Sequence, residues 1–164
     1  MKKLFAILVC GLMITVSGCG CNKSDNETTQ SSQNVESKSV KDIYATVSTM
    51  AEGKLTELDP QYLSNYYGID TTDLDEYVFA QSDTPESSAE TIIIIKSEDT
   101  SKFEDYKTSF ENYKKQKSQE LTNYNLPDQA KLVDKSKVVE KGNYLYLVIS
   151  ENANEIIDTI EKNI

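Results

Sequence analysis

Acidic side chains form the densest group of potential metal ligands in the sequence, at Asp70, Asp73 and Asp75. Closely spaced carboxylate oxygens are the ligands that Ca²⁺ takes in proteins. The spacing differs from that of an EF-hand loop, because two residues rather than one separate Asp70 from Asp73 and no glycine turns the chain between them. The alternative, which the acidity of the whole chain favours, is that Asp70 caps a helical turn while the other carboxylates are solvated.

Three tyrosines, Tyr62, Tyr66 and Tyr67, lie close together between Pro60 and Gly68. On a helix the first two share a face and Tyr67 points about 100° away, so we expect at least one ring to be exposed. Tyrosine combines a large contact area with a polar tip, and aromatic residues are enriched at binding surfaces, which makes this segment a candidate partner contact. The alternative is that two rings pack against the sheet while the third reaches solvent and needs no partner.

Whole classes of chemistry are excluded by composition, because the chain contains no His, no Arg and no Trp. A histidine base, a histidine metal ligand and an arginine clamp on phosphate are all ruled out. No recognised nucleophile, phosphate-loop or metal motif is present, and the Cys21 thiol lies in a polar segment with no pocket to activate it. We therefore expect no cofactor and no enzymatic activity, and predict a binding or interaction module.

The alternative class of function is a carboxylate-based envelope hydrolase, since such enzymes often carry no motif. Convergent acidic side chains with raised pKa values in a cleft would support the hydrolase. An exposed apolar or tyrosine patch would support the binding module instead.

Cys19 has the most specific chemical context in the chain. Two lysines precede an uncharged, mostly apolar run over residues 4–16, which is typical of a secretory signal. The sequence Val16-Ser17-Gly18-Cys19 resembles a bacterial lipobox, in which the cysteine takes a diacylglyceryl group and becomes the N-terminus after cleavage. We predict a signal peptide over residues 1–18 and a lipid at Cys19. The alternative is an ordinary secretory signal with an incidental cysteine.

The predicted location is the outer face of the cell membrane. The apolar run of thirteen residues would rise only about 20 Å as a helix, against about 30 Å of hydrocarbon to cross, whereas two acyl chains hold a protein stably. Loss of residues 1–18 removes Lys2 and Lys3 and takes the formal charge from −10 to −12. We therefore expect no nucleic-acid partner, and predict contact with the membrane through Cys19 and with an envelope protein or polymer.

Residues 19–39 are predicted to form a disordered tether, because the stretch 22–39 holds a single aliphatic residue, Val35, and no aromatic residue. A flexible segment of about 20 residues has a reach on the order of 25 Å. The folded domain is expected over residues 40–164, a normal size for a single core.

Apolar periodicity and turn residues predict the elements of this domain. The expected helices lie at 40–51, at 60–67 between Asp59-Pro60 and Gly68, at 101–124 before Pro127, and around the isoleucines from Ile156 to Ile164. The expected strands lie at 76–81, 89–96, 131–140 and 144–150. Together they predict an α+β fold, with two N-terminal helices before a four-stranded, mainly antiparallel sheet that helices cover on one face.

The strand–strand–helix order occurs twice in this prediction. The segment from Ile92 to Asp99 aligns with that from Leu145 to Asn152, which is consistent with an internal duplication. The alternative is that any buried strand leading into a capped helix has this pattern.

Three short motifs resemble a family of lipoproteins from Gram-positive bacteria, described as domain of unknown function 4358. They are Tyr67-Gly68-Ile69-Asp70, Ser88-Ala89-Glu90 and Lys141-Gly142-Asn143-Tyr144-Leu145, and their order and spacing carry the resemblance. The resemblance implies an extracytoplasmic lipoprotein context. It implies no activity, ligand or catalytic residue.

Overall fold

A computed structural model describes residues 38–164 of the chain. The predicted signal peptide, Cys19 and all but the last two residues of the predicted tether lie outside the described residues. The α-helices are α1 (Val40–Val47), α2 (Pro60–Tyr67), α3 (Phe103–Asn123), α4 (Pro127–Lys135) and α5 (Ala153–Glu161). The strands are β1 (Leu55–Glu57), β2 (Glu76–Ser82), β3 (Thr91–Lys96), β4 (Val138–Lys141) and β5 (Tyr144–Ile149). Within residues 38–164, no helix has both the length and the apolar character needed to cross a membrane.

The sheet is antiparallel throughout, as predicted, but it has five strands rather than four. The strand order is β1-β2-β3-β5-β4, so the two hairpins β2–β3 and β4–β5 meet at the central pair β3–β5. The additional strand, β1, pairs with the outer edge of β2, with Leu55 opposite Ser82. Three residues are too few to show the alternation that identifies a strand, which is why the sequence pattern missed β1.

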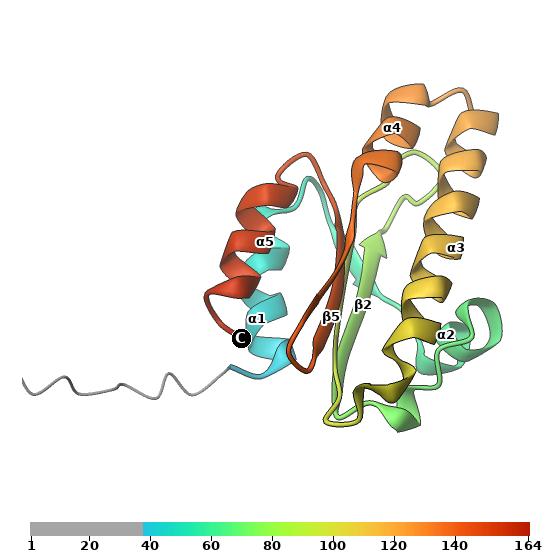
Figure 1. Cartoon of the computed structure of the whole chain (residues 1–164). Helices are drawn as coiled ribbons and strands as arrows, with labels where there is room; N and C mark the ends of the chain where they lie inside the picture. The colour runs from blue at the N-terminus through green and yellow to red at the C-terminus, as the bar shows by residue number, and fades with distance from the viewer. Residues whose placement is uncertain (1–37) are drawn as a thin grey trace, which may run out of the picture. The chain divides into compact units, whose positions relative to one another are not determined.

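Helices cover both faces of the sheet, so the prediction of one covered face is wrong. Helices α1 and α5 lie on one face, and α2, α3 and α4 lie on the other (Figure 1). The reason is visible in β3, where Ile93 and Ile95 join the core under α3 while Ile92 and Ile94 join the core under α1 and α5. A strand with aliphatic side chains on both faces requires apolar cover on both faces.

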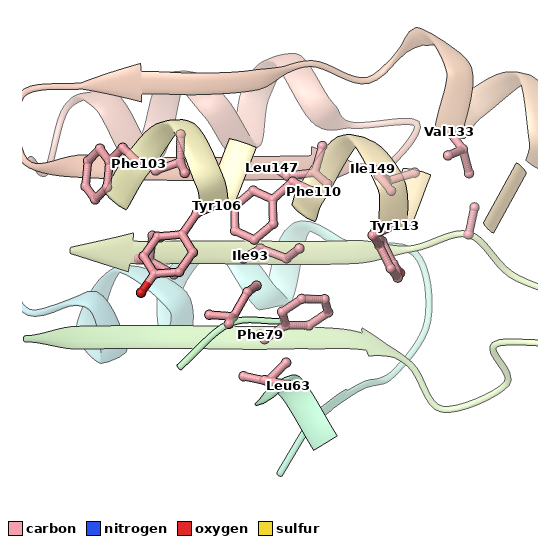
Figure 2. Close-up of a cluster of buried hydrophobic side chains, with 14 of the residues drawn as sticks. Leu63, Phe79, Ile93, Phe103, Tyr106, Phe110, Tyr113, Val133, Leu147 and Ile149 are labelled. Atoms are coloured by element: carbon pink, nitrogen blue, oxygen red, sulfur yellow. The ribbon is translucent and has the colours of Figure 1, made fainter. Parts of the chain in front are cut away.

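The predicted strand 131–140 is wrong in its first half, where the chain forms α4. Pro127 stands in the first turn of α4, a position that suits its fixed φ, and the buried residues Ala130 and Val133 have helical spacing. Only Val138–Lys141 is strand. Helix α3 has the apolar face that the sequence predicts, and its side chains Phe103, Tyr106, Phe110 and Tyr113 lie in a row over the sheet (Figure 2).

The two strand–strand–helix units do not superpose by a simple rotation. The two-fold axis that exchanges neighbouring antiparallel strands keeps every side chain on its own face. Helices α3 and α5 nevertheless lie on opposite faces, and the aligned residues Ile92 and Leu145 belong to opposite cores. This arrangement favours the alternative to an internal duplication, namely that any buried strand leading into a capped helix has this pattern.

Candidate functional site

Helix α2 holds the three tyrosines that the sequence singles out, and local chemistry fixes both of its ends. The Asp59 carboxylate accepts a hydrogen bond from the Gln61 backbone N–H at 2.8 Å, which caps the N-terminus. Gly68 ends the helix with φ +65°, a left-handed conformation that costs glycine little. Leu63 is buried and attaches the helix to the core, so the position of each tyrosine is determined.

The tyrosine rings form a chain that runs from solvent into the core. Tyr66 is 68% exposed and its ring lies 4.4 Å from that of Tyr62, which is 40% exposed. The Tyr62 ring in turn lies 5.8 Å from that of Tyr67. Tyr67 stacks on Phe79 of β2 at 5.2 Å and meets the edge of Tyr113 of α3 at 5.1 Å. Tyr62 and Tyr66 are therefore both exposed, which agrees with the prediction of at least one exposed ring. Tyr67 anchors this pair to the core.

The inner hydroxyl groups remain protonated near neutral pH. Burial raises the pKa of Tyr113 to about 12, and its hydroxyl lies 2.9 Å from that of Thr91. Burial also raises the pKa of Tyr67, and the nearby hydroxyls of Tyr113 and Tyr62 raise it further. Tyr67 and Tyr113 are therefore neutral, and their hydroxyl groups can both donate and accept hydrogen bonds.

Three adjoining hollows follow α3 beside these rings, and all three are lined by Gln116. Their volumes are about 420, 140 and 130 Å³. We call this surface the tyrosine groove. Five tyrosines line it: Tyr62, Tyr66, Tyr67, Tyr113 and Tyr124. Five amide side chains also line it: Gln81, Asn112, Gln116, Gln119 and Asn123.

Lys117 and Glu120 are the two charged residues that line the groove. Lys117 is buried, its ammonium donates a hydrogen bond to the Pro85 carbonyl oxygen, and it lies 3.9 Å from a Glu120 carboxylate oxygen. Burial lowers the pKa of Lys117. The ammonium is thus used to hold the β2–β3 loop against α3, which leaves Glu120 as the charge that the groove presents to solvent.

Sequence reasoning found the α2 side of the groove and missed the α3 side. Tyr124, which is 57% exposed at the end of α3, is one of the residues that it did not single out. The available signal was the spacing of Tyr113, Lys117, Glu120 and Tyr124, which places them on one stripe of the helix. Nothing in the local sequence shows that this stripe lies beside α2, because that contact depends on how both helices pack on the sheet.

A family model described as "Domain of unknown function (DUF4358)" matches residues 47–150, from the end of α1 to the residue after β5. The chain belongs to this family. The matched region includes every residue of the tyrosine groove and leaves out α5 and most of α1. No curated protein and no solved structure matches the chain.

The acidic side chains of the DUF4358 domain that were considered as calcium ligands each have a separate partner. Asp70 accepts hydrogen bonds from the N–H and hydroxyl of Thr72, as a cap does. Asp73 forms an ion pair with Lys102, and Asp75 accepts a hydrogen bond from the Glu98 N–H at 2.7 Å. Across the described part of the chain, no three acidic or cysteine side chains converge in a way that could hold a metal ion.

A separate hollow of about 500 Å³ lies between α4 and the start of α5, partly outside the residues that the family model matches. Glu90 does not line this hollow, is only 3% exposed, and its buried Oε2 atom has no hydrogen-bond partner. Burial raises the pKa of Glu90, and the polar groups of Ser150, Glu52 and Glu151 nearby only partly oppose this shift. A carboxyl group enclosed in this way cannot reach a substrate, so it does not supply the cleft that a carboxylate hydrolase needs.

Proposed function

We propose that this DUF4358 protein is an extracytoplasmic binding module, anchored in the cell membrane through a lipid on Cys19, that binds an envelope protein or polymer through the tyrosine groove without chemical turnover. The proposal for the membrane anchor rests on the signal and lipobox pattern of residues 1–19. The proposal for binding rests on a single observation, the exposed and stacked pair Tyr62 and Tyr66 on a helix whose third ring enters the core.

The arrangement of the pair suits binding because the rings are held before any partner arrives. Tyr62 lies between Tyr66 and Tyr67, and Tyr67 is fixed by Phe79 and Tyr113. Association costs about 0.5–1.5 kcal/mol for each flexible side chain that is immobilised, and rings that are already ordered avoid most of this cost. Tyrosine is accordingly among the residues that dominate binding energies at interfaces.

The entry of the chain into the folded domain leaves the groove accessible. The Lys38 backbone N–H donates to the Asn163 carbonyl oxygen at 3.1 Å, so the chain enters beside α1 and the C-terminal end. Helix α1 covers one face of the sheet, whereas α2 and α3 cover the other (Figure 1). A membrane-tethered chain can therefore present the groove away from the point where the tether joins it.

Site-specific photocrosslinking in the native host tests this function. A photoreactive residue at position 116 stands at the centre of the groove, and the same residue at position 158, exposed on α5, is the matched control. We expect adducts from position 116 that disappear when Tyr62→Ala and Tyr66→Ala are added, and no such adducts from position 158. Equal labelling from both positions, or adducts that persist without the two rings, would contradict the proposal.

A further inference from the structure

The lining of the tyrosine groove is selective in what it contains. Rings and side-chain amides make up most of it, and Leu, Ile, Val and Met are absent from it. An amphipathic helix or a strand-like peptide anchors itself through apolar side chains, which require aliphatic pockets. The described groove therefore offers little to a protein partner beyond aromatic faces and amide hydrogen bonds.

The charge of the groove and of the whole chain disfavours anionic polymers as partners. Glu120 is the charge that the groove presents, since Lys117 is buried and bonded to Pro85. The formal charge of the whole chain is −10. An anionic polymer would meet repulsion and would find no exposed cation in the groove to pair with.

A sugar ring matches both features of the lining. Its C–H face is apolar and packs on an aromatic ring through dispersion and weak C–H contacts. Its rim of hydroxyl groups both donates and accepts, as do the side chains of Gln116, Gln119 and Asn123. Tyr66, stacked on Tyr62 behind it, supplies an exposed aromatic ring at one end of the groove, and Tyr124 supplies another at the other end.

The extent of the groove indicates a chain of sugars. Its α3 residues run from Ser109 to Tyr124, and fifteen helical steps correspond to a rise of roughly 22 Å. A single sugar ring would cover only part of that length.

We propose that the tyrosine groove binds an uncharged glycan chain, with pyranose rings stacked on Tyr66, which Tyr62 backs, and on Tyr124, and with hydroxyl or N-acetyl groups bonded to the amides around Gln116. This inference rests on the proposed binding function and specifies its ligand. The ligand class is a neutral oligosaccharide of several hexopyranose units.

Titration of the purified full-length chain with three probes tests the ligand class: chitohexaose, cellohexaose and the anionic polymer polygalacturonate. Because the chain has ten tyrosines and no tryptophan, its intrinsic emission comes from tyrosine, and half of these residues line the groove, so binding there should change it. We expect saturable binding of at least one neutral hexamer and none of polygalacturonate. A preference for chitohexaose would indicate that the side-chain amides around Gln116 bind N-acetyl groups. Equal binding of both neutral hexamers would indicate that these amides bind hydroxyl groups.

Matched variants separate stacking from general loss of fold. Tyr66→Ala should weaken binding of the neutral hexamer at least tenfold, Tyr66→Phe should retain it, and Tyr44→Ala, a partly buried tyrosine on the α1 face, should leave it unchanged. Failure of both neutral hexamers to bind, or binding that survives Tyr66→Ala, would overturn the glycan assignment. Crosslinks from position 116 to a protein would overturn the glycan while supporting the binding function, and the absence of any groove-dependent crosslink would overturn both.

Discussion

Replacing Tyr67 should destabilise the domain far more than replacing Tyr66, although the two residues are neighbours in the sequence. Tyr67 packs against the rings of Phe79 and Tyr113, and each such pair contributes about 0.5–1.5 kcal/mol beyond area burial. Complete truncation of a buried aromatic side chain costs about 3–5 kcal/mol, and Tyr67 is only partly buried. We therefore expect Tyr67→Ala to lower the free energy of unfolding by roughly 2–3 kcal/mol.

Tyr66→Ala should lower that free energy by less than about 1 kcal/mol, because the side chain is 68% exposed and its one ring contact is with Tyr62. Urea denaturation followed by circular dichroism measures both changes. With a slope of about 2 kcal/mol per molar urea, the middle of the usual range, the midpoint should fall by roughly 1–1.5 M for Tyr67→Ala and by at most about 0.5 M for Tyr66→Ala. Tyr67→Phe, which keeps the ring, is the control and should stay close to wild type. Equal midpoints for the two alanine variants would refute the division into an anchoring ring and a binding ring.

Four further outcomes are expected. Cys19→Ala should abolish incorporation of a clickable fatty acid while Cys21→Ala should not, and labelling of the Cys19 variant would refute the anchor. Ile94→Asp should unfold the domain, because Ile94 is fully buried between Val78 and Tyr146 in the central strands and an unpaired buried charge costs several kcal/mol; a cooperative melt close to wild type would contradict this. Calorimetry should show no Ca²⁺ site tighter than about millimolar, and micromolar binding lost in Asp73→Asn would contradict the structural role of that carboxylate. Because the pKa of Glu90 is raised in the folded state, its contribution to stability is present below the ordinary value of 4.5 and is lost as pH rises through the folded-state pKa. Glu90→Gln should therefore be more stable than wild type at pH 7 but not at pH 4. Thermal melts at the two pH values measure this difference, and equal differences at both would contradict it.

Local signals predict those parts of the fold that local chemistry determines. The limits of α2 follow from Asp59, Pro60 and Gly68, whose capping and backbone preferences act within a few residues. The pairing of β2 with β3 and of β4 with β5 follows from short connections between β-rich runs. The aliphatic run Ile92 to Ile95 correctly predicts a central strand, but its second implication, cover on both faces, follows only when all four side chains are considered together.

The parts that sequence reasoning missed depend on packing between distant segments. Strand β1 exists because Leu55–Glu57 meets the free edge of β2, and its three residues carry no pattern of their own. Pro127 is compatible with the end of one helix or the start of another, and only the burial of Ala130 and Val133 against the sheet decides for α4. In the candidate site, the tyrosines of α2 were identified from spacing, whereas Gln116 and Lys117 acquire their place only because α2 and the β2–β3 loop pack against α3.

Sedimentation with isolated cell envelopes of the host tests the central claim most directly. The envelopes are first stripped of lipid with detergent, so that the anchor at Cys19 cannot contribute, and the full-length chain is added in the same detergent. Wild type and Tyr44→Ala should sediment with the envelopes, while the double variant Tyr62→Ala, Tyr66→Ala should stay in solution with a melting temperature close to that of wild type. Sedimentation of the double variant to the same extent as wild type would contradict the assignment of binding to the tyrosine groove.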